Sequence, residues 1–140
     1  MRLKAPLPGW TAKADVVVIG SGVAGLTTAL QIRSHDLSVL LVTKSFIDAG
    51  STKWAQGGIA AALGPGDSPE QHEKDTLVAG AGLCDLPAVK VLVSEGPEAV
   101  RKLIARGAVF DKSETGEIAL TREGGHLRNR ILHAGGDATG

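Results

Sequence analysis

The feature that most constrains the fold is a strand, turn, helix and strand pattern near the start of the chain. A β-branched run covers Val16–Ile19, a helical stretch covers about residues 24–33, and a second apolar run covers Val39–Val42. Short apolar strands on both sides of a helix are typical of two parallel strands that are buried on both faces. The sequence therefore predicts an α/β fold that begins with a βαβ unit, with a right-handed crossover.

The turn between the first strand and the helix has the G-x-G-x-x-G pattern. Gly20 permits a tight turn, Gly22 lets a pyrophosphate approach the backbone, and Gly25 lets the helix pack closely on the strand. The N–H groups at the start of the helix can bind phosphate. We therefore expect a Rossmann-like dinucleotide site, and the alternative is a glycine-rich turn without a ligand. The candidate residues are Gly20, Ser21, Gly22, Val23, Ala24 and Gly25.

The end of the second strand bears on which dinucleotide is bound. An acidic residue that binds the ribose is expected there in nicotinamide enzymes, but the strand ends with Thr43 and Lys44. A lysine can contact a phosphate or an adenosine oxygen instead. Lys44 therefore disfavours an NAD-dependent dehydrogenase more than it disfavours a flavoprotein.

A second motif, "GSTKWAQGGIAAA" at residues 50–62, is polar and glycine-rich at its start and apolar at its end. Such a segment can approach a large flat ligand and then enter the core. Its hydroxyl, amide and backbone N–H groups can donate hydrogen bonds to a ring system that gains electron density. A buried loop without a ligand is the alternative. The candidate residues are Ser51, Thr52, Lys53, Trp54, Ala55, Gln56, Gly57 and Gly58.

Composition excludes several classes of function. The 140 residues carry 15 basic and 15 acidic side chains, so no net charge recruits nucleic acid or an anionic membrane. Cys84 is the only cysteine, which excludes an internal disulfide and suits the cytoplasm. No apolar run has the length of a membrane-spanning helix. We expect one domain, or part of one, that binds neither nucleic acid nor membrane.

The rest of the chain predicts further elements. Asp67 or Ser68 caps a helix that starts at Pro69 and ends near Val78, and His72 is expected on its surface. Asp85 caps a helix over residues 87–94, and Gly96-Pro97 starts a separate helix that ends at Gly107. Residues 108–125 are expected to form two short strands around a turn at residues 113–116.

The four stretches "VVVIGSGVAGL", "LVTKS", "GSTKWAQGGIAAA" and "LTREGGHLRNRILHAGGDATG", in this order, resemble the flavoproteins of the succinate dehydrogenase and fumarate reductase superfamily, and within it the L-aspartate oxidases. The resemblance implies a leader at residues 1–14 and part of an FAD-binding domain at residues 15–140. The capping domain and the C-terminal part of the fold would follow Gly140. The Gly135-Gly136 pair makes the last stretch one residue longer than the family pattern.

The resemblance also implies roles for the candidate residues. Residues 21–24 would touch the FAD pyrophosphate, Lys44 the adenosine side, and residues 51–58 the ribityl chain and the isoalloxazine. Related enzymes that bind FAD covalently do so through a histidine in this loop. No histidine lies between residues 36 and 71, so the FAD is expected to be non-covalent.

The charged segment "LTREGGHLRNR" is the expected substrate contact. Arg122, Arg128 and Arg130 are candidates for binding the substrate carboxylates, and Glu123 for orienting the substrate by binding its ammonium group. His126 and His133 are weaker candidates. The alternative is a solvated hairpin with ordinary ion pairs. The resemblance places the arginine for proton transfer beyond the end of the chain.

Three hypotheses follow. The first is an L-aspartate oxidase, which oxidises L-aspartate to iminoaspartate with hydride transfer to the flavin. Its electron acceptor is oxygen or fumarate, and its product leads to quinolinate and NAD, with quinolinate synthase as a possible partner. This chain would be an inactive amino-terminal fragment of it. The second hypothesis is a fragment of a fumarate reductase or succinate dehydrogenase type flavoprotein. The third is a non-catalytic FAD-binding module.

Overall fold

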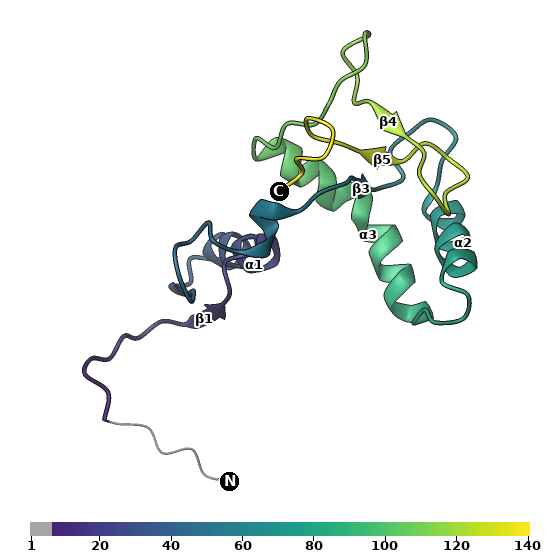
Figure 1. The fold of residues 1–140 in the computed structure, drawn as a ribbon. Helices are drawn as coiled ribbons and strands as arrows, with labels where there is room; N and C mark the ends of the chain where they lie inside the picture. Colours follow the sequence, from purple (N-terminus) through teal and green to yellow (C-terminus); the bar gives the residue numbers. More distant parts are fainter. Residues whose placement is uncertain (1–6) are drawn as a thin grey trace. The chain divides into compact units, whose positions relative to one another are not determined.

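The computed structural model describes residues 7–140, which form two compact units (Figure 1). The first unit ends at Lys53 and the second runs from Trp54 to Gly140. Residues 1–6 of the expected leader lie outside the described residues, and residues 7–14 form neither helix nor strand. No helix within the described range is long and apolar enough to cross a membrane.

The first unit is the expected βαβ arrangement. Strands β1 (Val16–Ile19) and β2 (Val39–Val42) pair in parallel, with Val16 opposite Val39 and Ile19 opposite Val42, and helix α1 (Val23–Arg33) connects them. The Asp15 carboxylate accepts hydrogen bonds from the backbone and the hydroxyl of Ser38 and so fixes the start of the pair. Both strands have the predicted bounds, and the helix begins one residue earlier than predicted.

The polar start of the second motif forms a short 3-10 helix, η1 (Ser51–Trp54), at the boundary between the units. In the second unit, strands β3 (Ile59–Ala60), β4 (Leu120–Thr121) and β5 (Ile131–Leu132) form an antiparallel sheet in the order β3-β5-β4. Its core contains Ala61, Val100, Phe110 and Leu132. Since Ala61 is buried, the alanine-rich end of the motif enters the core as predicted.

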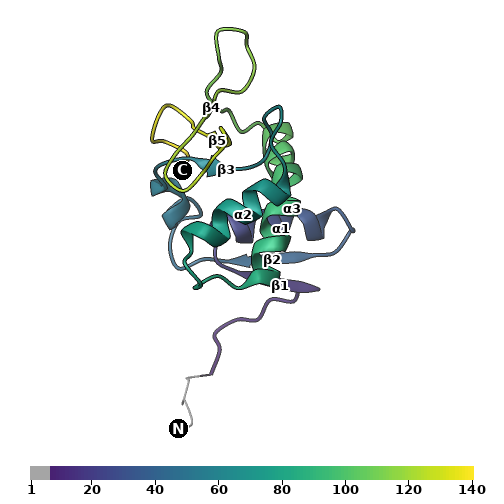
Figure 2. The same cartoon turned by 90° about the vertical axis from the view of Figure 1, so that its right-hand side faces the viewer.

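Two helices complete the second unit and pack against each other, as Figure 2 shows. Helix α2 (Pro69–Ala79) starts where predicted, with the Ser68 hydroxyl accepting a hydrogen bond from the Gln71 N–H at 3.3 Å. Helix α3 (Leu86–Ala105) starts after Asp85, whose carboxylate accepts from the Ala88 N–H at 2.9 Å. Both predicted N-caps are therefore confirmed.

The predicted break in α3 at Gly96-Pro97 is wrong, because the helix continues through it. Part of the clash that an interior proline causes is with the Cβ of the preceding residue, and Gly96 has no Cβ. Val89, Val93, Pro97 and Val100 are all buried on one side of the helix. Burial of this continuous face offsets the hydrogen bond that Pro97 cannot donate.

The prediction of a two-stranded hairpin at residues 108–125 is only partly correct. The turn is present, since the Gly116 N–H donates to the Ser113 carbonyl at 2.9 Å, and Lys112 and Ile118 form an isolated antiparallel bridge. The strand that follows, β4, pairs with β5 instead. This pairing places Thr121 opposite Ile131 and Leu120 opposite Leu132, which brings the end of β4 close to His133.

Candidate functional site

The glycine turn after β1 has the geometry that its sequence predicts. Gly20 has a φ of 108°, a backbone conformation that residues with a side chain rarely adopt. Its N–H donates to the Val42 carbonyl at 2.8 Å. A Cβ at Gly25 would overlap the Gly20 carbonyl oxygen, so the helix can approach the turn only because Gly25 lacks one. Ser21 is buried, and its hydroxyl bonds that of Thr43 at 3.0 Å.

The start of α1 is linked to the second motif by one hydrogen bond. Gly22 is the N-cap residue and provides no side-chain cap. The Val23 N–H instead donates to the Thr52 hydroxyl at 3.0 Å, and a Cβ on Gly22 would lie 3.3 Å from the same oxygen. The structure therefore brings Thr52 to the glycine turn, although 29 residues separate it from Val23.

The other candidates of the first unit lie on its surface. Ala24, Lys44 and Ser51 are exposed. The Lys53 ammonium pairs with Asp48 at 2.9 Å, and this hydrogen bond lowers the pKa of the Asp48 carboxyl. The polar side chains of Lys44, Ser51 and Lys53 are therefore accessible from solvent.

The part of the second motif that belongs to the second unit contains two kinds of residue. Trp54, Ala55 and Gln56 are exposed, so the Trp54 side chain does not belong to the core of this unit. Gly57 has a φ of 77°. At Gly58 a Cβ would overlap the Ile131 side chain and lie 2.8 Å from the Leu132 carbonyl oxygen. Gly58 is thus required for the approach of β5, whatever the motif binds.

The prediction that Arg130 contacts a substrate is wrong. Its side chain is fully buried and forms a two-pronged ion pair with Asp67, Nε to Oδ2 at 2.8 Å and Nη2 to Oδ1 at 2.7 Å. Its Nη1 donates to Asp75 Oδ2 at 2.9 Å. All three donor nitrogens therefore bind protein carboxylates, and Arg130 attaches the segment before β5 to α2 and to the loop before it.

The neighbours of Arg130 extend this buried polar cluster. The Asp75 carboxylate also accepts from the Leu127 N–H at 2.9 Å, and this bond is the main cause that lowers the pKa of Asp75. His72 is buried, contrary to the surface position predicted for it, and its ring centroid lies 5.4 Å from that of His126. Burial, followed by the charge of Arg130, lowers the pKa of His72.

The remaining arginines of the charged segment are exposed. Arg128 donates to the Gln71 side chain at 2.9 Å, and Arg122 follows β4 on the surface. Both arginines are therefore accessible to a carboxylate ligand, whereas Arg130 is not.

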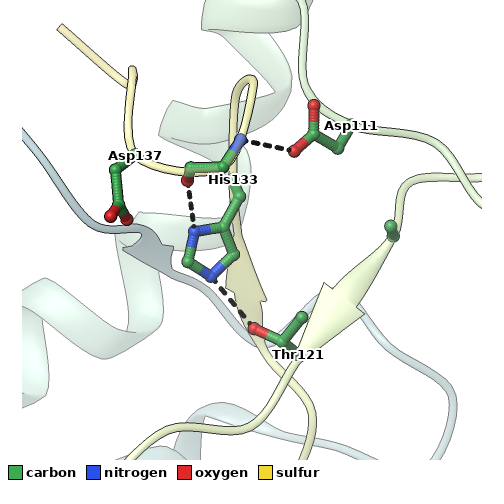
Figure 3. A pocket seen from close by; sticks show the side chains of 6 residues that line it. Asp111, Thr121, His133 and Asp137 are labelled. Atoms are coloured by element: carbon green, nitrogen blue, oxygen red, sulfur yellow. Dashed lines mark hydrogen bonds between the residues drawn. The ribbon is translucent and has the colours of Figure 1, made fainter.

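Glu123, the candidate for binding an ammonium group, contacts His133, which lines a hollow of about 370 Å³ in the second unit. Figure 3 shows this hollow. The Glu123 side chain is half exposed, and its Oε1 lies 3.0 Å from His133 Nε2. The same nitrogen lies 3.0 Å from the Thr121 hydroxyl, while His133 Nδ1 bonds the Gly136 carbonyl at 2.9 Å. This hollow, called the His133 hollow below, is lined by Asp111, Ala119, Thr121, His133, Gly136 and Asp137.

Sequence reasoning missed Asp111 entirely. Its carboxylate accepts from the Gly135 N–H at 2.8 Å and from the Gly136 N–H at 3.2 Å, and these two bonds lower the pKa of Asp111. Both glycines have positive φ, 56° and 80°. The extra glycine of this segment therefore belongs to a turn that Asp111 stabilises.

Comparison with known families agrees with the geometry of the glycine turn. Residues 15–140 match the FAD binding domain family. The chain belongs to this family. Over all 140 residues, this FAD-binding domain is 69% identical to the L-aspartate oxidase of Streptomyces coelicolor, and it covers 24% of that protein. It thus spans about a quarter of the length of that relative.

Solved structures show the same fold. The FAD-binding domain is similar to the Mycobacterium smegmatis Sdh1 complex in the apo form, with a TM-score of 0.83 and 36% identity over 90% of this chain and 22% of that one. It is also similar to E. coli quinol fumarate reductase FrdA, with a TM-score of 0.82 and 28% identity over 90% of this chain and 22% of that one. The fold of this chain is therefore that of the FAD-binding part of succinate dehydrogenase and fumarate reductase flavoproteins.

Proposed function

We propose that this chain is the FAD-binding part of an L-aspartate oxidase and that its β1–α1–β2 unit is a Rossmann-like phosphate-binding unit. The observation that carries the proposal is the 69% identity to the Streptomyces coelicolor L-aspartate oxidase, which extends over every residue of the chain. The activity is that of the whole protein, since the chain covers about a quarter of that relative's length.

The geometry of the first unit fits a pyrophosphate. Gly20, Gly22 and Gly25 leave three positions of the turn at the start of α1 without side chains, where N–H groups and the helix dipole attract an anion. Gly20, Ser21, Gly22, Val23, Ala24 and Gly25 would contact the pyrophosphate, and Lys44 the adenosine side. Ser51, Thr52, Lys53, Trp54, Ala55, Gln56, Gly57 and Gly58 would contact the ribityl chain and the isoalloxazine.

Two further features of the sequence and site support the proposal. No histidine lies between residues 36 and 71 to form a covalent link, so FAD would be held non-covalently. Glu123 is half exposed beside the His133 hollow, where its carboxylate can bind the ammonium group of an amino acid. A succinate has no such group, so Glu123 favours L-aspartate as the substrate.

In this proposal, bound FAD supplies the hydride acceptor for the oxidation of L-aspartate to iminoaspartate. Glu123 orients the substrate, and the exposed Arg122 and Arg128 are available for its carboxylates. Oxygen or fumarate reoxidises the flavin, and the product enters quinolinate and NAD synthesis in the cytoplasm, where quinolinate synthase would be the next enzyme.

Two measurements test the proposal. The chain is incubated with FAD and desalted, and we expect the protein to retain a yellow flavin that acid precipitation releases. For activity, the chain replaces the matched 140 residues of the Streptomyces coelicolor enzyme, and this chimera is assayed with L-aspartate and with succinate. Turnover of L-aspartate supports the proposal, and flavin binding without effect of either dicarboxylate indicates a non-catalytic FAD module.

A second candidate is a succinate dehydrogenase or fumarate reductase type flavoprotein, which the similarity to the Sdh1 structure favours. This candidate is supported if the chimera oxidises succinate and does not oxidise L-aspartate.

A further inference from the structure

We propose that His133 is a positioning residue for Glu123, and that Asp111 sets the protonation pattern of His133 through the Gly135–Gly136 turn. The inference rests on the proposed function only for the substrate that Glu123 binds. The contacts that carry it all lie within the second unit, and Figure 3 shows the hydrogen bond between His133 and Thr121.

The partners of the His133 ring determine where its protons lie. A backbone carbonyl can only accept, so the 2.9 Å contact with Gly136 requires a proton on Nδ1. The hydrogen bond of Nε2 is with the Thr121 hydroxyl, and the 3.0 Å approach of Glu123 Oε1 to the same nitrogen is an ion pair only when Nε2 carries a proton as well. A ring that carries both protons would face Glu123 Oε1 with an N–H group, since the two atoms lie 3.0 Å apart. Loss of the Nε2 proton leaves the Nδ1–H tautomer, which accepts from Thr121 and releases Glu123.

Asp111 holds the carbonyl that fixes this pattern. Its two oxygens accept from the N–H groups of Gly135 and Gly136, and its own N–H donates to the His133 carbonyl at 2.8 Å. Asp111 therefore contacts both ends of the segment between His133 and Gly136. Two glycines with positive φ make this turn possible, since other residues rarely adopt that conformation.

The charges around the ring support the same pattern. Asp111 and Asp137 line the hollow together with His133, and a Glu123 oxygen lies 3.0 Å from the ring. Hydrogen bonds from the glycine turn lower the pKa of Asp111 and keep it ionised. An ionised Asp111 can accept from both glycine N–H groups, which keeps the Gly136 carbonyl at His133 Nδ1.

The first test is nitrogen NMR of the histidine-labelled chain, which distinguishes the imidazolium and both neutral tautomers without FAD or L-aspartate. We expect His133 as the imidazolium or the Nδ1–H tautomer in the wild type and in the control Asp137→Asn. We expect the Nε2–H tautomer in Asp111→Ala. An Nε2–H tautomer in the wild type, or no change in Asp111→Ala, would overturn the proposal.

The second test uses two substitutions, each of which keeps the contact of only one ring nitrogen of His133. The amide of His133→Gln reaches the place of Nε2, whereas that of His133→Asn reaches only the place of Nδ1. In the chimera, we expect His133→Asn to raise KM for L-aspartate about tenfold with kcat nearly unchanged, and His133→Gln to restore most of the loss. Equal effects of the two variants would contradict positioning through Nε2.

These two tests separate failure of the inference from failure of the proposed function. A chimera that does not oxidise L-aspartate contradicts the function, but the tautomer of His133 is still measured. In that case, the carboxyl carbon shift of Glu123 in the chain replaces KM as the second readout. We expect it to change in His133→Asn and to change much less in His133→Gln, and equal changes would contradict the inference.

Discussion

The guanidinium of Arg130 binds both oxygens of Asp67, at 2.8 Å and 2.7 Å, with both side chains almost completely buried. A third nitrogen of the same guanidinium binds Asp75. The pair joins residues 63 positions apart and connects the loop before α2 with the start of β5. The buried cluster therefore holds Leu127 and Arg130, a few positions after Glu123, against α2.

Removing one carboxylate of this cluster should destabilise the second unit strongly. Asp67→Asn leaves the buried Arg130 with a single ionised partner, and we expect a loss of about 3 kcal/mol in the free energy of unfolding. Urea denaturation followed by circular dichroism measures it. The matched control is Glu98→Gln, which breaks the exposed pair with Arg101 and should cost no more than about 0.5 kcal/mol. Equal losses in both variants would contradict a structural role for Arg130.

Acid should destabilise the fold in two steps. Burial lowers the pKa of His72 below 6.5, so below that pH the unfolded chain binds a proton that the folded chain resists, and stability falls. The pKa of Asp75 is lowered below 3.8, so its contribution is present above that pH and is lost as the pH falls below it. Melting temperatures measured against pH test this.

The variant His72→Gln should remove the upper step and retain the lower one. Lys74→Gln, an exposed change on the same helix, should retain both. A wild-type melting temperature that stays constant between about pH 7 and pH 5 would contradict the assignment to His72.

Gly25→Ala should disrupt the glycine turn, because its Cβ would overlap the Gly20 carbonyl oxygen. Since that obstacle is backbone, we expect a destabilisation of about 2 kcal/mol or more and loss of FAD retention. Hydrogen exchange of the β1 amides reports the first effect and flavin absorbance after desalting the second. Gly9→Ala, whose Cβ meets no atom within 4 Å, is the control and should behave like the wild type.

Thr52 should contribute to flavin affinity through its bond with the Val23 N–H. Thr52→Val removes the acceptor, and the loss of a cap of this kind, about 1 kcal/mol, should weaken FAD binding about fivefold. Thr52→Ser keeps the hydroxyl and should bind FAD like the wild type. Quenching of flavin fluorescence measures both affinities. Equal affinity of Val and Ser variants would show that the hydroxyl does not organise the site.

The local parts of this fold were predictable from the sequence, and the contacts between distant segments were not. The bounds of β1 and β2 follow from two apolar runs, and Ser68 and Asp85 mark helix starts, because each signal is contained in a few consecutive residues. Gly96-Pro97 predicted a break because both residues disfavour a helix locally. The helix continues because α3 buries one continuous face, and this packing cannot be seen in a few consecutive residues.

The candidate site shows the same division. The glycine turn was predicted with its conformation, since the pattern itself requires close backbone approach. Arg130 was assigned to the substrate because its partners, Asp67 and Asp75, lie 63 and 55 positions away. Asp111 was missed for the same reason, since it meets Gly135 only through the fold. Glu123 remains a prediction.

The most direct test of the central claim is the anaerobic addition of L-aspartate to the FAD-loaded chimera. We predict that the visible absorption of the oxidised flavin is lost, and that Glu123→Gln slows this reduction by L-aspartate far more than any reduction by succinate. A chimera that keeps its yellow colour with L-aspartate, while the parent Streptomyces coelicolor enzyme is bleached, would contradict the claim.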